Sequence, residues 1–207
     1  MLTHLIPVFN TAPHHLMECV NSIRSQDPHP ILIVDDGSTE AGTWEAIQLI
    51  QMTVPDIIVE EIPENVGTAA ALNVGHSLIK TPYTALMGSS DIAIAGKYKA
   101  QIEYLKGNPK VDVLGTSLSA FRAADPFRKV IFTLTHNLIP KPGDKKNHDR
   151  FFLCNHGTVI YKNAAVDKVG GYNEKFRRGQ DVELWSRMWA NGAIFRNVNK
   201  VMYLWRR

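Results

Sequence analysis

The segment ILIVDDGSTE, residues 31–40, runs through four apolar residues and ends on two adjacent carboxylates, Asp35 and Asp36. A continuous apolar run of this length predicts a strand that is buried on both faces. Similar runs alternate with helical patterns along the first half of the chain, which predicts a mostly parallel sheet flanked by helices. Ligands of such sheets bind beyond the carboxyl ends of the strands. The two acids are therefore expected either at a binding crevice or as caps of the following helix.

The same patterns predict the remaining elements. Strands are expected at 3–9, 31–36, 56–62, 83–88, 111–116 and 157–161, with two closing strands at 193–197 and 201–205. Helices are expected near 13–26, 42–51, 67–79, 96–106, 163–169 and 181–190. Between the two halves, the proline- and glycine-containing segment 118–156 is expected to be irregular, with a loop at the polar stretch 141–150.

The composition indicates a single domain over residues 1–207, because 44% hydrophobic residues suffice for one substantial core. The 23 basic and 20 acidic residues nearly balance, so charge does not argue for a nucleic-acid or membrane partner. Two cysteines are too few for a disulfide framework. No signal peptide and no apolar stretch long enough to span a membrane is found, so a cytoplasmic location is expected.

Four motifs occur in order along nearly the whole chain. They are IPVFN at 6–10, VDDGST at 34–39, ENVGTAAALNVG at 64–75 and VGGYNEKFRRGQDVELWSRM at 169–188. Together they resemble the family-2 inverting glycosyltransferases, which have the Rossmann-like GT-A fold of nucleotide-diphospho-sugar transferases. The resemblance implies a nucleotide-sugar-binding half at about 1–117, and a half at about 118–207 that holds the acceptor and the catalytic base.

The resemblance also implies a nucleotide-diphosphate sugar donor, expected to be a UDP-sugar. Carboxylates suit the donor's base and ribose because charge-assisted hydrogen bonds are strong. Many family members carry an arginine or a lysine whose side chain reaches the nucleotide. This chain departs from that pattern, because Leu72 occupies the arginine position and Thr68 the lysine position. Arg122, Lys129 or the lysines of the polar loop are candidates to supply the missing cation. The expected donor-binding residues are Pro7, Phe9, Asn10, Asp35, Asp36, Asn65, Gly67 and Ser90.

The resemblance places a metal-binding motif at GSSD, residues 88–91, where family members commonly have two or three aspartates. Only Asp91 remains in this chain. One carboxylate can hold a divalent cation, Mn²⁺ or Mg²⁺, together with substrate phosphates and water. Asp91 is therefore the expected metal ligand. The alternative is that Asp91 caps a helix or turn. The shortened motif is also compatible with weak metal affinity or with a protein that has lost its activity.

Asp181 corresponds to the family's general base for an inverting displacement. A carboxylate at the head of a helix also interacts favourably with the helix dipole, so a purely structural role is the alternative. Further contacts to phosphate or acceptor are expected from His156, Gln180 and Trp185. A lone histidine is often structural, however, and the helical position of Trp185 is also typical of a core residue.

The leading hypothesis is thus a metal-dependent glycosyltransferase of hexosyltransferase type. Its acceptor is left open among a glycan, a lipid, a protein and a modified nucleic acid. The alternative is a catalytically impaired GT-A protein that binds a nucleotide or glycan without transfer. A nucleotidyltransferase or a dinucleotide-binding dehydrogenase is disfavoured, because no glycine-rich phosphate loop follows the first strand.

Overall fold

The computed structural model describes residues 1–125, 127–134 and 154–207. The strands are β1 (Leu2–Val8), β2 (Ile31–Asp36), β3 (Ile57–Ile62), β4 (Tyr83–Leu86), β5 (Ile92–Ala93), β6 (Val113–Phe121), β7 (Val130–Leu134), β8 (Ile160–Lys162) and β9 (Phe195–Arg206). The helices are α1 (Pro13–Arg24), α2 (Ala41–Thr53), α3 (Thr68–Leu78), α4 (Lys97–Gly107), α5 (Asn163–Asp167) and α6 (Gln180–Ala190), with a 3-10 turn η1 (His156–Thr158). In the described residues, no helix has the length and apolar character needed to cross a membrane.

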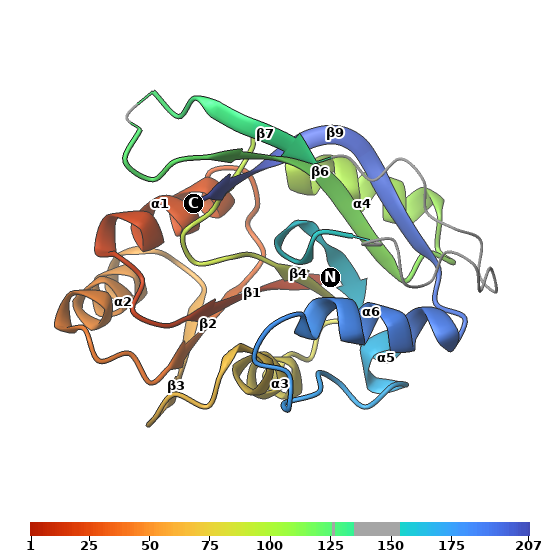
Figure 1. The fold of residues 1–207 in the computed structure, drawn as a ribbon, viewed down its shortest axis with the longest axis horizontal. Coiled ribbons are helices and arrows are strands. Elements are labelled where there is room, and N and C mark those ends of the chain that lie inside the picture. The colour runs from red at the N-terminus through yellow and green to blue at the C-terminus, as the bar shows by residue number, and fades with distance from the viewer. Residues whose placement is uncertain (126, 135–153) are drawn as a thin grey trace.

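The described strands form one nine-stranded sheet in the order β3-β2-β1-β4-β8-β6-β9-β5, with β7 paired to β6 (Figure 1). Strands β3, β2, β1 and β4 pair in parallel. Strand β8 is antiparallel to both β4 and β6, whereas β9 runs parallel to β6 and antiparallel to β5. The predicted α/β class is therefore confirmed, with parallel pairing concentrated in the first half and a mixed sheet in the second.

Strand β2 buries all six of its residues because helices cover both faces of the sheet. Ile31 and Ile33 pack in one hydrophobic cluster with residues of α1 and α2. Leu32 and Val34 point to the opposite face, as alternation along a strand requires, and pack in a second cluster with α3 and α6. The buried residues of α1 recur at the i, i+3, i+4, i+7 spacing of an amphipathic helix. These two clusters hold β2, and hence the two acids at its carboxyl end, in a fixed position.

The segment expected to be irregular contains regular structure at its beginning. Strand β6 continues to Phe121, and β7 returns antiparallel to it as a hairpin. Four of the five residues of β7 are exposed, so the strand lacks the alternating burial by which a sequence pattern identifies strands. The expected loop at 141–150 lies outside the described residues.

The closing segment is one strand, β9, and the expectation of two strands was wrong. Val198 pairs with Thr116 and Val201 with Ser117, so Asn199 and Lys200 form an irregularity in an otherwise continuous ladder. Both residues are exposed. A bulge of this kind inserts polar residues into a strand without ending it, whereas in the sequence the same residues are typical of a break.

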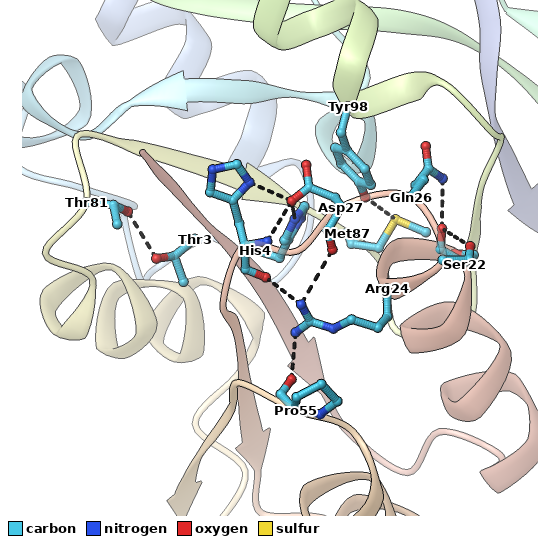
Figure 2. A network of polar contacts seen from close by, with 12 residues as sticks. Thr3, His4, Ser22, Arg24, Gln26, Asp27, Pro55, Thr81, Met87 and Tyr98 are labelled. Atoms are coloured by element: carbon cyan, nitrogen blue, oxygen red, sulfur yellow. Dashed lines mark hydrogen bonds and ion pairs between the residues drawn. The ribbon is translucent and has the colours of Figure 1, made fainter.

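A buried polar network lies at the opposite end of the strands from Asp35 and Asp36 (Figure 2). Asp27, just before β2, accepts a hydrogen bond from the His29 ring nitrogen at 2.6 Å, and His4 Nε2 lies 3.3 Å from the same carboxylate oxygen. Burial alone raises the pKa of Asp27, but the His4 and His29 contacts bring it down to about 2. Arg24 donates to the Pro55 and His29 carbonyls, which fixes the loop before β2.

Candidate functional site

A cavity of about 700 Å³ opens at the carboxyl ends of β1 and β4. This edge of the sheet is where ligands bind in open α/β folds. Among the residues expected from the sequence, Pro7, Asp91, His156, Gln180 and Asp181 line it. They come from both halves of the chain, which the continuous sheet brings together. The cavity is therefore the candidate active site.

Asp91 is the most constrained carboxylate of the cavity. The Tyr203 hydroxyl donates to its Oδ2 at 2.6 Å, and the Arg206 backbone N–H donates to its Oδ1 at 2.8 Å. Burial raises the pKa of Asp91 to about 6, although these two donors and the charge of Arg206 act in the opposite direction. A side chain at Gly88 would collide with the Asp91 carboxylate, so this turn has no room for a second acid at position 88.

Asp181 is the second residue of α6. The residue before the helix, Gly179, has a φ of 70°, which is a left-handed conformation. Nearby, His156 Nε2 lies 2.9 Å from the Tyr172 hydroxyl, and the two groups share a hydrogen bond. Burial lowers the pKa of His156, and the charge of Asp181 offsets this only in part. The imidazole is therefore neutral near pH 7.

Trp185 is buried and does not line the cavity. Its ring centroid lies 5.9 Å from that of His156 and 5.7 Å from that of Phe195. It belongs to the second hydrophobic cluster, together with Leu184 of the same helix. Trp185 thus supports the His156 ring from behind, as the core interpretation predicts.

The two acids that end β2 connect three segments beside the cavity, which we term the loop corner (residues 9–11, 35–40 and 64–67). Asp35 accepts hydrogen bonds from the backbone and hydroxyl of Ser38. Asp36 accepts from the backbone N–H groups of Val66 and Gly67 and from the Asn65 side chain. Asp36 is only 3% exposed. Its observed contacts therefore hold the entry to α3 in place.

Asn10 makes a similar link between the loops after β1 and β2. Its Oδ1 accepts from the backbone N–H groups of Thr39 and Glu40, and it adopts a left-handed φ of 47°. Gly37 allows the loops to approach, because a Cβ there would lie 2.6 Å from the Asn65 backbone nitrogen. The expected contacts that lie outside the cavity wall are Phe9, Asn10, Asp35, Asp36, Asn65, Gly67, Ser90 and Trp185.

Arg177 and Arg178 also line the cavity, and sequence reasoning did not single them out. Their only sequence signal is their place in FRRGQD, immediately before α6. The candidates considered instead, Arg122 and Lys129, do not line the cavity, and the loop lysines lie outside the described residues. Tyr203, which donates to Asp91, was likewise missed because it is distant in sequence from the GSSD turn.

The donor set for a metal ion is small. No cluster of three or more histidine, cysteine, aspartate or glutamate side chains suited to a metal occurs among the described residues. Asp91 offers one carboxylate, and each of its oxygens accepts a single identified hydrogen bond. Each carboxylate oxygen has a further lone pair. The residues therefore fit a divalent cation only if substrate phosphates and water complete its coordination.

Comparison with known proteins agrees with this geometry. The model of the family "Glycosyl transferase family 2" matches residues 3–170. The amylovoran biosynthesis glycosyltransferase AmsE of Erwinia amylovora is 24% identical over 205 residues, which cover 98% of this chain and 74% of that protein. The UDP-Gal:alpha-D-GlcNAc-diphosphoundecaprenol beta-1,3-galactosyltransferase of Escherichia coli is 25% identical over 196 residues, which cover 92% and 68%.

Among solved structures, S. aureus TarS 1–349 in complex with UDP superimposes with a TM-score of 0.73 at 17% identity. The match covers 100% of this chain and 60% of that one, so this chain spans about three fifths of the solved protein. The complex of TarS 1–349 with UDP-GlcNAc gives the same TM-score. The fold is thus the GT-A fold, and the chain belongs to glycosyl transferase family 2.

Proposed function

We propose that this chain transfers a sugar from a UDP-sugar to an acceptor hydroxyl with inversion at the anomeric carbon. The observation that carries the proposal is the meeting of Asp91 and Asp181 on the wall of one cavity, at the carboxyl ends of the strands. The E. coli relative is named for a UDP-galactose donor, and TarS has been solved with UDP and UDP-GlcNAc. Both support the choice of nucleotide.

Asp181 is the general base in this proposal. The acceptor oxygen attacks the anomeric carbon, its proton passes to the Asp181 carboxylate, and the bond from that carbon to the diphosphate oxygen breaks. Asp181 suits the role because it lies in the cavity wall and its neighbour His156 is neutral. General base catalysis of this kind contributes typically ~10²–10⁴-fold to the rate.

Asp91 would hold a divalent cation, Mn²⁺ or Mg²⁺, together with oxygens of the donor diphosphate and water. Such a cation, when bound, acts as a Lewis acid that stabilises charge on the leaving phosphate. Tyr203 and the Arg206 N–H fix the orientation of the carboxylate toward the cavity. The loop corner positions the donor nucleoside beside this carboxylate.

The acceptor enters, in this proposal, along the side of the cavity formed by the second half of the chain. Leu118, Leu134 and Trp205 line that side and give it an apolar surface. An apolar wall favours the carbon skeleton of a sugar ring or a lipid over a highly charged acceptor. A second candidate function, nucleotide or glycan binding without transfer, is favoured by the single carboxylate of the GSSD turn and its hydrogen-bonded oxygens.

The two functions are separated by the variant Asp181→Asn, because an amide keeps the shape of the side chain but accepts no proton. UDP binding is measured by calorimetry, and release of UDP from UDP-sugars is measured with and without Mn²⁺, with water as acceptor. We expect the variant to bind UDP as the wild type does. We expect it to cleave UDP-sugars, measured as UDP formed, ~10²–10⁴-fold more slowly. Glu45→Gln, which changes an exposed acid on α2, is the matched control and retains wild-type turnover.

Normal turnover by Asp181→Asn would refute the assignment of the base. If the wild type binds UDP but releases none from any UDP-sugar, the binding function is supported instead.

A further inference from the structure

The only cationic groups that line the cavity, among the described residues, belong to Arg177 and Arg178. The other charged lining residues are the acids Asp91 and Asp181, and burial lowers the pKa of His156. A diphosphate is an anion and would be repelled by two carboxylates across a cavity of low dielectric. Binding it therefore requires the two arginines or a metal cation, and the arginines are part of the chain.

Both guanidinium groups are available for a ligand. Arg177 has one identified contact, a long one of 3.4 Å from its Nη1 to the Asn65 Oδ1. Arg178 makes no hydrogen bond or ion pair with any residue in the described part of the chain. By contrast, Arg187 is bonded to Glu183 and to two carbonyls, and Arg206 to Glu18 and the Ser90 carbonyl. These last two arginines are committed to the fold, whereas the pair before α6 is not.

Arg177 lies where two segments distant in sequence approach each other. A Cβ on Gly67 would lie 2.7 Å from Arg177 Nη1, so the guanidinium passes directly over the entry to α3. The uncharged Thr68 and Leu72 form the cavity wall there and provide no cation of their own. Arg177 thus brings positive charge to a part of the wall that lacks it.

The two backbone N–H groups just before α3 do not offer an alternative anion site. The backbone N–H groups of Val66 and Gly67 already donate to the Asp36 carboxylate. A phosphate at this position would displace a buried acid from its partners, and buried carboxylates that lose such bonds are costly. Among the described residues, the guanidinium groups are therefore the cationic donors of the cavity wall.

We propose that Arg177 and Arg178 bind the diphosphate of the sugar-nucleotide donor and of the departing nucleoside diphosphate. A planar guanidinium donates two parallel hydrogen bonds to phosphate oxygens, which suits an arginine pair to a diphosphate. The inference rests on the proposed function, because it takes the ligand to be a nucleoside diphosphate. It adds a binding site for the phosphates that does not depend on the Asp91 carboxylate.

The test compares a ligand with a diphosphate and one without. Affinities for UDP and for uridine are measured by calorimetry at one Mn²⁺ concentration, for the wild type and for Arg177→Gln, Arg178→Gln and the double variant. Each single substitution is expected to weaken UDP binding by about tenfold or more, the usual size of a hydrogen bond to a charged group, and to leave uridine binding unchanged. Arg177→Lys and Arg178→Lys are expected to lose less UDP affinity than the glutamine variants. Lysine keeps the positive charge but lacks the two parallel N–H donors of a guanidinium group.

Lys175→Gln is the matched control, since it removes an exposed cation from the same loop outside the cavity wall. It is expected to bind UDP as the wild type does. Unchanged UDP affinity in the double variant would overturn this inference and leave the proposed function intact. A parallel loss of UDP and uridine affinity would also overturn it, because the arginines would then act on the shape of the cavity. If the wild type binds none of UDP, GDP, TDP and CDP, the proposed function itself fails, and the inference fails with it.

Discussion

Lys97 is the first residue of α4, and its side chain is completely buried. Its ammonium nitrogen has no hydrogen-bond partner in the described part of the chain and lies 4.3 Å from the centroid of the Tyr98 ring. Burial lowers the pKa of Lys97 from 10.5 to about 7, and the charge of Asp27 opposes this only partly. The folded protein therefore holds this proton less tightly than the unfolded chain does.

The pH dependence that follows has a definite sign. Between about pH 7 and 10.5 the unfolded chain binds more protons at this lysine than the folded protein, so stability rises with pH across that window. Replacing Lys97 by Met, a linear side chain of similar length, removes the effect. We expect Lys97→Met to unfold with a free energy roughly 1–3 kcal/mol higher at pH 7. The difference should shrink by up to about 1.4 kcal/mol for each pH unit above 7.

Urea unfolding at pH 7, 8 and 9 measures both quantities. Other groups that titrate in this range are present in both proteins and cancel in the difference. A constant difference across the three pH values would show that Lys97 is not deprotonated in the folded state.

Single residues were predicted from the sequence where a local motif carries the information. Asp91 and Asp181 each stand in such a motif, and the structure brings them to one cavity wall together with His156, a lone histidine in the sequence. Arg177 carries no comparable signal, because its importance arises from lying over Gly67, more than a hundred positions earlier in the chain. Contacts of this kind depend on the tertiary structure and are not encoded in local spacing.

At the scale of elements, the packing of α3 against β1 and β2 rests on a glycine within the helix. A Cβ on Gly75 would collide with Leu5 Cδ1 and lie 3.0 Å from Val34 Cγ2. Ala at this position would favour the helix by about 0.5–1 kcal/mol through backbone entropy. The strands beneath cannot yield, however, because Leu5 and Val34 are themselves buried, and overpacking of this kind costs typically about 1–3 kcal/mol.

We therefore expect Gly75→Ala to lower the free energy of unfolding by about 1–2 kcal/mol in spite of its better helix propensity. Gly107→Ala is the control, since it adds the same methyl group at the last residue of α4 with nothing within 4 Å. The control should be neutral or slightly stabilising. Urea unfolding of both variants distinguishes the outcomes, and equal effects at the two positions would show that α3 can move away from the sheet at little cost.

Most elements in the first half were predictable because each long buried strand or helix shows its own periodicity, whereas the two-residue strand β5 is too short to show any. The second half was less predictable for a physical reason. Strand β7 is exposed along most of its length. Strand β9 contains two polar residues, Asn199 and Lys200, at a register shift in its pairing with β6. Neither strand buries a regular face, so their pairing depends on β6, which is already part of the sheet.

At the scale of the whole molecule, the two halves expected from the sequence share one sheet and both of its hydrophobic clusters. Strand β8 joins β4 to β6, so the ladder passes from the first half into the second without a break. The second hydrophobic cluster combines Leu32 and Val34 with Tyr161, Trp185 and Phe195. Neither half can bury these residues without the other. The two halves therefore belong to one folding unit, and the functional division between them stays a prediction.

This interpretation predicts that the described sheet opens as a single cooperative unit. Hydrogen exchange of the folded protein, followed by mass spectrometry at increasing urea, is the measurement. Amides of β1 and β2 should reach the same opening free energy, with the same dependence on urea, as amides of β6 and β9. Adding UDP at 100 times its dissociation constant should then raise the opening free energy of both sets by the same amount, about 2.7 kcal/mol, because the ligand stabilises the folded state as a whole.

Different opening free energies for the two sets would contradict a single unit, and so would a UDP effect confined to the first half. A UDP effect confined to the first half would also indicate that residues 1–117 alone form the donor site. The structure argues otherwise, since Asp91, on the first side of the cavity, is held in place by Tyr203 and Arg206 from the last strand of the chain. Opening of β9 would release a carboxylate that lines the cavity, so the integrity of the cavity and the stability of the whole sheet are expected to be lost together.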